Sequence, residues 1–255
     1  MLIIHMFPCL SDNYGFLIQD QATGKVATID TPDASVIMAE ADKLGWSIDY
    51  IWNTHWHPDH AGGNQAIEKA TGAFSLGPSE VAAKISPLSQ IVEPGDVVTL
   101  GESRARVIDV GGHTLGHIAY YFETDAAAFV GDALFALGCG RLFEGSAAQA
   151  WDSLMRLMAL PDETMVYCAH EYTAANARFS ATLETDNPAL TSRLADIAAL
   201  RAKNLPTVPT SIGLERATNP FVRADLPSLR QAVGAGPQAP AYEVFGQIRL
   251  LKDQF

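Results

Sequence analysis

The sequence predicts an α+β protein, an αβ sandwich with mixed sheets followed by a small helical domain. Short β-like runs alternate with turns and helical stretches over the first 170 residues. After His170 the pattern changes to helical periodicity. The chain has 255 residues, of which 48% are hydrophobic and 18% charged, so it can bury the core of one large domain with an appendage.

The first part of the chain contains most of the expected strands. The opening MLIIHMFPCLSDNYG is apolar and is expected to hold a first strand. It is not expected to be a signal peptide, because it lacks a basic region and a small-residue cleavage site and contains Pro8 early. YGFLIQD and KVATID, separated by Thr23-Gly24, predict a hairpin. Apolar spacing predicts a helix over residues 34–44 and another near QAIEKA. Further strands are expected at DYIWNT, AFSLG, DVVTL, RARVIDV, AYYFE and AAFVG.

The last part of the chain is expected to be helical. NARFSATLE has helical periodicity, and Asn187 with Pro188 predicts the start of another helix. The apolar face of that helix would consist of Leu190, Leu194, Ile197 and Leu200. GAGPQAPA predicts a loop, and the tail YEVFGQIRLLKDQF a helix. We place a boundary near residues 171–175, between a first domain of residues 1–172 and a mostly helical domain of residues 173–255.

The charge distribution bears on the partners of the protein. The net charge is −12, which disfavours nucleic acid as a partner. Residues 1–170 hold 8 Lys and Arg against 21 Asp and Glu, whereas residues 171–255 hold 9 against 8. The cations of the last part favour contact with an anion. No apolar window approaches the roughly 18 residues of a membrane span, and no long apolar or heptad stretch stands out, so we expect a monomer without a membrane partner.

Cysteine usage bears on the cellular compartment. Cys9, Cys139 and Cys168 are an odd number without CxxC spacing, which argues against a disulfide framework. We therefore expect buried, reduced thiols and a cytoplasmic protein.

The segment NTHWHPDHAGGN, residues 53–64, gathers four groups that can bind a metal. His55 and His57 are two residues apart, so they point to one side of an extended segment. Pro58 ends that segment, and Asp59 and His60 then present a second pair of ligands. Imidazole and carboxylate together suit Zn, Fe or Mn, and Gly62-Gly63 would let the backbone pass close to such a centre.

Three further residues of ligand type follow apolar strands elsewhere in the chain. His113 follows RVIDV within GGHTLGH, Asp132 follows the strand of FVGD, and His170 follows MVYCA. The ends of strands in an αβ sheet project side chains into a shared cleft, so these residues are expected to complete the ligand set. His5 and His117 are expected to be structural.

THWHPDH, GGHTLGH, VGD and AHEYT, in this order, resemble the metallo-β-lactamase-fold hydrolases, which implies an αββα sandwich. GCGRLFEG, HEYTAAN, TNPFVR and the terminal RLLKDQF are similar to the glyoxalase II family, the hydroxyacylglutathione hydrolases. This resemblance covers nearly the whole chain, and it implies that the small C-terminal helical domain binds substrate.

The resemblance also implies two divalent metal ions that share a bridging carboxylate. Zn is the expected metal, and Fe or Mn would also suit the ligands. The ligands of the first ion, those of the second and the bridge would be, in that order, His55, His57 and His113; Asp59, His60 and His170; and Asp132. Asp30, at the end of VATID, would orient a ligand histidine.

Such a centre explains how a thioester is cleaved. Two cations about 3.5–4 Å apart can share a water and lower its pKa, so a metal-bridging hydroxide is the expected nucleophile. Asp132 would hold both cations, and Asp59 is the conceivable alternative base. The leaving thiolate is stable near neutral pH, so a dedicated general acid is less needed.

The substrate implied by the resemblance carries the carboxylates of glutathione. Arg141, Tyr172, Arg249 and Lys252 are assigned to glutathione, with Phe143 and Asn176 as further contacts. Arg suits a carboxylate because its donors are paired. Arg141 stands where other members have Lys, which keeps the charge but changes the contact geometry.

The predicted function is therefore hydrolysis of S-(2-hydroxyacyl)glutathione, for example S-D-lactoylglutathione to glutathione and D-lactate, the second step of methylglyoxal detoxification. Three alternatives stay open. The first is a glutathione-persulfide dioxygenase with one iron, which would share HWHPDH but lack the helical tail. The second is a nucleic-acid-processing hydrolase, which the net charge disfavours. The third is a non-catalytic metal-binding module.

Overall fold

The computed structural model describes residues 1–255, and its contacts divide the chain into two compact units. Unit 1 comprises residues 1–109 and 116–131, and unit 2 comprises residues 110–115 and 132–255. The two units therefore alternate along the chain. The domain boundary predicted near residue 172 stays a prediction.

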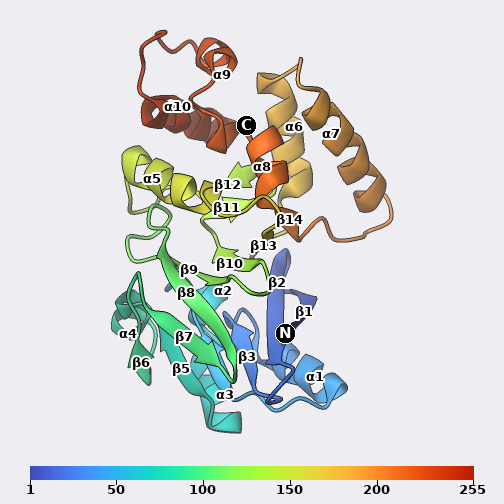
Figure 1. The fold of residues 1–255 in the computed structure, drawn as a ribbon, viewed down its shortest axis with the longest axis vertical. Coiled ribbons are helices and arrows are strands. Elements are labelled where there is room, and N and C mark those ends of the chain that lie inside the picture. The colour runs from blue at the N-terminus through green and yellow to red at the C-terminus, as the bar shows by residue number, and fades with distance from the viewer. The chain divides into compact units, whose positions relative to one another are not determined.

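The first sheet of unit 1 is mixed. Its strands run in the order β1 (Leu2–Cys9), β2 (Asn13–Asp20), β3 (Val26–Ile29), β4 (Tyr50–Trp52), β5 (Phe74–Gly77) and β6 (Gln90–Ile91) (Figure 1). β1 to β3 are antiparallel, whereas β3 to β6 are parallel. The predicted hairpin is confirmed, because Phe16 of β2 pairs with Ile29 of β3.

Four antiparallel strands of unit 1 form the second layer. They run in the order β10 (Ala127–Gly131), β9 (Ile118–Phe122), β8 (Ser103–Asp109) and β7 (Val97–Leu100). Aromatic side chains join this layer to the first sheet. The Trp52 and Phe122 rings stack with centroids 5.8 Å apart, and Phe16 meets Phe129 edge to face at 5.5 Å. The core of the sandwich is thus aromatic.

Helices α1 (Ala34–Leu44) and α3 (Asn64–Thr71) cover the other face of the first sheet. Ile37 of α1 and Ile67 of α3 are fully buried in one cluster with Leu17 and Ile51 of the strands. Asp33 caps α1 by accepting from two backbone N–H groups, as its position before the apolar run favours. The shorter helices of the unit are α2 (Pro58–Ala61) and α4 (Ser79–Lys84).

Unit 2 is mostly helical, as the sequence predicts for its last part. Its strands are β11 (Leu134–Phe135), β12 (Gly138–Cys139), β13 (Met165–Cys168) and β14 (Thr210–Ser211). Its helices are α5 (Ala147–Met158), α6 (Thr173–Leu183), α7 (Pro188–Arg201), α8 (Ile212–Thr218), η1 (Pro220–Val222), α9 (Pro227–Ala232) and α10 (Ala241–Gln254) (Figure 1). Helix α5 was not predicted.

The helices of unit 2 pack around a chain of aromatic rings. The centroid of the Phe221 ring lies 6.0 Å from that of Phe179 and 6.2 Å from that of Phe245. The Phe245 ring in turn lies beside Trp151 of α5. The predicted start of α7 is confirmed, because the Asn187 side chain accepts from two backbone N–H groups of the first turn. The α+β class is confirmed by the mixed first sheet, the antiparallel second layer and these helices. None of the helices combines the length and apolar character needed to cross a membrane.

Candidate metal centre and substrate pocket

The histidine loop, residues 53–64, begins where the buried strand β4 ends. Pro58 is the first residue of the short helix α2, so the chain turns directly after His57. Gly63 permits the close return of the backbone, because a Cβ there would lie 2.7 Å from the Thr31 carbonyl oxygen. The loop is therefore held tightly against the end of β3.

Asp30 lies at the centre of the hydrogen bonds that hold this loop. Its carboxylate accepts from Thr54 N–H at 2.7 Å, from the Thr54 hydroxyl at 2.7 Å and from His60 Nδ1 at 2.8 Å. Asp30 itself has a left-handed backbone with φ of 59°, a strained conformation that recurs at functional sites. Because its oxygens accept three hydrogen bonds, Asp30 is placed to orient ligands.

These contacts determine which ring nitrogens carry lone pairs. The Thr54 hydroxyl gives its only proton to Asp30, so His55 Nδ1, 3.1 Å from that hydroxyl, must be the donor in their contact. His60 Nδ1 donates to Asp30 in the same way. The lone pairs of His55 and His60 are therefore both on Nε2, the tautomer that binds a metal through that atom.

The four predicted ligands of unit 1 come together in pairs. His55 Nε2 lies 3.0 Å from His57 Nδ1, and His60 Nε2 lies 3.5 Å from Asp59 Oδ2. Asn13 Nδ2 donates to Asp59 Oδ2 at 3.1 Å. Neutral imidazoles and a carboxylate that face one another in this way suit a divalent cation.

His117 packs against His55, as expected of a structural histidine. Its ring is fully buried and stacks on that of His55, with centroids 4.4 Å apart and an angle of 15° between the planes. Its Nδ1 lies 3.0 Å from the Ile118 carbonyl oxygen, to which it donates. The ring therefore fixes the plane of His55.

Asp132 joins the two predicted histidine ligands of unit 2. Its Oδ2 lies 3.3 Å from His113 Nε2, and its Oδ1 lies 3.2 Å from His170 Nε2. His113 Nδ1 donates to the Arg141 carbonyl at 2.7 Å, which leaves the Nε2 lone pair directed at Asp132. A carboxylate with each oxygen facing a different imidazole is the arrangement expected of a bridging ligand.

All six predicted glutathione contacts line one cavity of about 520 Å³ in unit 2, together with His113 and Asp132. Three of these side chains are exposed: Phe143, Arg141 and Tyr172. The centroids of the Phe143 and His113 rings are 5.2 Å apart. Burial, and then the charges of Arg249, Arg178 and Arg141, lower the pKa of Lys252. The cavity thus holds the cationic side chains of Arg141, Arg249 and Lys252, together with Asp253, beside the predicted metal ligands.

Three of the six residues already donate to backbone carbonyls of unit 2. Lys252 Nζ donates to the Ala175 carbonyl at 3.3 Å. Arg249 is only 6% exposed, and it donates to the Cys139 carbonyl at 2.9 Å and to Asp253 at 3.0 Å. Asn176 is 5% exposed and donates to the Ala136 carbonyl at 3.1 Å. Asp253, which also lies 3.5 Å from Arg141 Nε, was not predicted.

The three thiols cannot supply a nucleophile near neutral pH. All three cysteines are free and buried. Burial raises the pKa of Cys9 and of Cys168 to about 12, and that of Cys139 to about 11. A thiol with such a pKa is almost wholly protonated at pH 7. This agrees with the structural role expected from the sequence.

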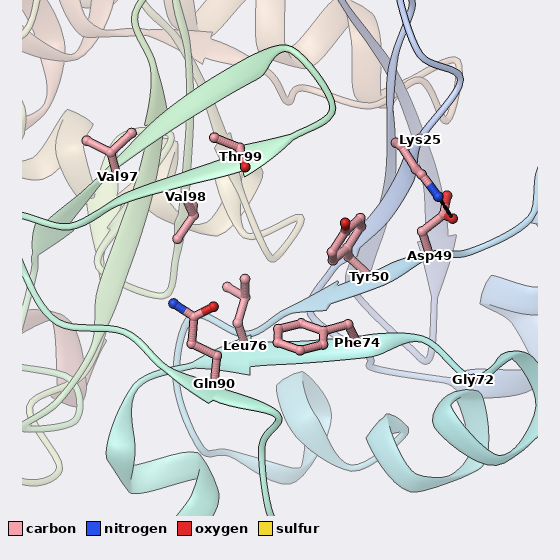
Figure 2. Close-up of a pocket in the computed structure, with 10 residues that line it drawn as sticks. All are labelled: Lys25, Asp49, Tyr50, Gly72, Phe74, Leu76, Gln90, Val97, Val98 and Thr99. Atoms are coloured by element: carbon pink, nitrogen blue, oxygen red, sulfur yellow. Dashed lines mark hydrogen bonds and ion pairs between the residues drawn. The ribbon is translucent and has the colours of Figure 1, made fainter.

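A second cavity of similar size, about 510 Å³, lies in unit 1 at the beginning of β4 and β5. Figure 2 shows Tyr50 and Phe74 of these strands beside the ion pair of Lys25 and Asp49, with Val98 of β7 across the opening. The histidine loop follows the other end of β4. None of the predicted site residues lines this cavity.

Some residues that build the site were not found from the sequence. Asn13 donates to Asp59, and the Thr54 hydroxyl donates to Asp30 and accepts from His55. Both residue types are too common, and both positions too isolated in the chain, to be singled out from the sequence. Asn219 could be predicted as a cap from the pair Asn219-Pro220, and it does cap η1. Its amide also donates to the carbonyls of Phe135 and Gly138, which no local pattern indicates.

Comparison with known proteins places this site in a family. A model described as the metallo-beta-lactamase superfamily matches residues 16–170, and one described as the hydroxyacylglutathione hydrolase C-terminus matches residues 171–255. Among solved structures, ETHE1 from Myxococcus xanthus is 26% identical, with a TM-score of 0.67 and coverage of 98% of each chain. A metallo-beta-lactamase from Staphylococcus aureus is 20% identical, with a TM-score of 0.67, over 99% of this chain and 71% of that one.

The fold and its histidine and aspartate set thus define a member of the metallo-β-lactamase superfamily, as the sequence predicts. The hydroxyacylglutathione hydrolase of Hyphomonas neptunium is 54% identical over 255 residues, covering 100% of this chain and 99% of the relative. That of Maricaulis maris is 55% identical over 254 residues, with the same coverage. The chain belongs to the hydroxyacylglutathione hydrolase family, also called glyoxalase II.

Proposed function

We propose that this chain hydrolyses the thioester of S-(2-hydroxyacyl)glutathione, such as S-D-lactoylglutathione, to glutathione and the 2-hydroxy acid. The observation that carries the proposal is one cavity that contains His113, Asp132 and the cationic side chains of Arg141 and Lys252. Relatives of full length and more than half identical carry the hydrolase name, which supports the same reaction.

The cavity residues divide the recognition of such a substrate. Arg141 and Lys252 supply positive charge for the carboxylates of a tripeptide, and the exposed ring of Phe143 offers a surface for its backbone. Tyr172 stacks on the His170 ring with centroids 4.7 Å apart, so it joins peptide binding to a metal-ligand residue. The acyl group would then lie beside Asp132.

As part of this proposal, the predicted ligand residues hold two divalent metal ions, with Zn as the expected metal. When bound, the ions lower the pKa of a water and polarise the thioester carbonyl. Asp30 keeps the histidine lone pairs directed at the metal side, while Asn13 holds Asp59. The departing glutathione thiolate needs no proton from the chain. We further propose a cytoplasmic protein, because all three cysteines are free. We propose that it is a monomer, because no long apolar or heptad stretch stands out in the sequence.

The test is hydrolysis of S-D-lactoylglutathione by the purified protein, with metal content measured on the same sample. We expect rapid hydrolysis with about two metal ions per chain, and loss of the rate after chelation. The same acyl group on N-acetylcysteamine, which lacks the carboxylates, should be hydrolysed with a much lower kcat/KM. No hydrolysis, one iron per chain and oxygen uptake with glutathione persulfide would instead identify the dioxygenase alternative.

A further inference from the structure

A free strand edge borders the second cavity, the one in unit 1. β7 is the last strand of its sheet and pairs only with β8. Val97, Val98 and Thr99, three successive residues of β7, all line this cavity. Across from them lie Phe74 and Leu76 of β5 (Figure 2). Successive side chains of a strand point to opposite faces, so a cavity that contacts all three residues must run along the edge of β7.

This edge carries backbone groups that face away from β8. The Asp96 carbonyl accepts from the Val107 N–H, which fixes the alternation of hydrogen bonds between the two strands. In that alternation the backbone of Val98 is bonded to β8. The N–H and C=O groups of Val97 and Thr99 therefore point outward, where the backbone of a further strand would pair with them.

The edge strand lacks the usual protection against pairing with another chain. Edge strands in soluble proteins commonly carry charged residues or proline. The residues of β7 are VVTL, which include neither. Val97 is 49% exposed, and Phe74 on the other side of the cavity is 43% exposed. Exposed apolar side chains beside outward-facing backbone groups are the features of a surface to which an extended peptide adds a strand.

The cavity determines which side chain of an added strand would enter it. The residue opposite Val98 would point to the same face as Val98, which is buried. Leu76 lines the cavity on that side, and the rings of Tyr50 and Phe74 meet edge to face with centroids 6.2 Å apart. A cavity of about 510 Å³ with these walls suits a large apolar or aromatic side chain.

The other face of the sheet is cationic beside this edge. Arg104 and Arg106 of β8 are exposed and stand opposite Thr99 and Val97 in the register. Residues 1–170 hold only 8 Lys and Arg against 21 Asp and Glu, so two arginines on one strand face are unusual there. An added strand would lie two strand spacings, about 9–10 Å, from β8. Glutamate side chains opposite Val97 and Thr99 are long enough to meet the arginines across that distance.

We propose that the free edge of β7 is a docking site for an extended segment of a partner protein in which glutamates alternate with apolar residues. The backbone of the segment pairs with Val97 and Thr99, one apolar side chain enters the cavity, and the glutamates face Arg104 and Arg106. Backbone hydrogen bonds supply the affinity, and the alternation supplies the specificity. A second copy of this chain fits less well, because its β7 carries no carboxylate. The inference does not depend on thioester hydrolysis, since none of these residues lines the substrate cavity.

The test measures binding of the fluorescein-labelled peptide EVEFEVE to the purified protein by fluorescence anisotropy. The peptide EEVFVEE keeps the composition and loses the alternation, and KVKFKVK keeps the alternation and reverses the charge. We expect saturable binding of EVEFEVE, with each comparison peptide at least about tenfold weaker. If either comparison peptide bound as tightly as EVEFEVE, the proposed chemistry of the partner would be wrong.

Substitutions in the protein locate the bound peptide. Thr99→Pro removes an N–H that β8 does not use, and proline is tolerated where the N–H of an edge strand faces solvent. We expect this variant to bind EVEFEVE at least about fivefold more weakly. Thr99→Val keeps the N–H and should bind like the parent protein. The double variant Arg104→Glu/Arg106→Glu should reverse the preference and bind KVKFKVK more tightly than EVEFEVE, a result that misfolding cannot produce.

Urea unfolding shows which variants are folded, whether or not the thioester is the substrate. Unchanged affinity for EVEFEVE in folded Thr99→Pro, or an unchanged preference in the folded double variant, would overturn the proposal. Sedimentation equilibrium tests the other occupant of the edge. A dimer of the parent protein that Thr99→Pro abolishes would assign the edge to a second copy of this chain instead of a partner.

Discussion

The two regions that supply the predicted metal ligands are built in different ways. In unit 1, four predicted ligands lie within six residues, and the side chains that hold this loop by hydrogen bonds come from at most 46 positions away. In unit 2, three ligands are spread from His113 to His170. The contacts that hold the segment between Asp132 and Arg141 reach across 40 to 110 positions.

This difference indicates where each region is vulnerable. The histidine loop depends on Asp30, a single buried carboxylate that fixes the tautomers of two histidines. The segment of unit 2 depends on several weak contacts to backbone carbonyls, each of which contributes little alone. In unit 1, substitution of one residue, Asp30, should therefore cause a large loss of metal affinity. In unit 2, substitution of any one supporting residue should cause only a small loss, except at Asp132 itself.

The largest effect is expected for Asp132→Ala, which removes the group that faces both histidines of unit 2. Each histidine would lose an oxygen 3.2–3.3 Å from its Nε2. We expect kcat to fall by more than about 100-fold, beyond the loss of an orienting partner, together with a lower metal content. The exposed Asp152 of α5 provides the control, since Asp152→Ala should keep both values. Full metal and full rate in Asp132→Ala would refute the bridging role.

The next effect is expected for Asp30→Asn, which tests whether unit 1 depends on one carboxylate. Asn tolerates the left-handed backbone at this position, so the change should leave the turn intact. Its amide has one oxygen where the carboxylate has two acceptors, and its NH₂ group would face a donor. We expect metal affinity to fall by about 10–100-fold, as measured by competition with a chelator.

The control for this change is Asp33→Asn, three residues further along the chain. Asp33 caps α1, and Asn is an equally good cap, so both stability and metal affinity should be preserved. If Asp30→Asn bound metal as tightly as the control, the tautomers of His55 and His60 would have to be fixed in some other way. The contrast between the two regions would then disappear.

The same contrast explains what could be predicted from the sequence. The histidine loop could be predicted as a metal site because its ligand-type residues are close together and follow an apolar strand. His113, Asp132 and His170 each follow such a strand too, which predicts that they share a cleft, but only the resemblance to a family assigns each of them to a particular ion. The roles of Asn219 and Arg249 depend on partners 81 to 110 positions away, and no spacing rule reaches that far.

Helix α5 was missed for another reason. Ser146 caps it by accepting from Gln149 N–H, and Leu154 and Leu157 are buried on one face, so signals of a helix were present in the sequence. Its first turn, AAQA, contains no large apolar residue to mark a buried face, which weakens the helical pattern at the start. By contrast, α7 was predicted to start at Pro188 because Asn187 and Pro188 mark its beginning unambiguously.

The smallest effect on metal affinity is expected for Asp20→Asn. This variant tests whether the folded state of unit 1 can be destabilised without disturbing its histidine loop. Burial would raise the pKa of the Asp20 carboxyl, but hydrogen bonds from the Glu102 N–H and from the hydroxyls of Thr23 and Ser103 lower it to about 2. The carboxylate thereby ties the β2–β3 turn to the β7–β8 turn. We expect the variant to lose about 1–3 kcal/mol of unfolding free energy at pH 7.

The pH dependence follows from the sign of that shift. Because the folded pKa of about 2 is below the ordinary value of 3.8, the stabilisation by Asp20 is complete above that ordinary value and is lost as the pH falls toward 2. Urea unfolding of both proteins should therefore show a stability difference that is constant from pH 7 to about 5 and shrinks below pH 4. Asp42→Asn, on the exposed side of α1, should show no such difference.

Metal affinity at pH 7 should match the parent protein in both variants, because Asp20 contacts no part of residues 53–64. A loss of metal affinity in Asp20→Asn would mean that the geometry of the histidine loop depends on distant contacts of unit 1. The predicted ligands of unit 2 depend in the same way on contacts with distant helices.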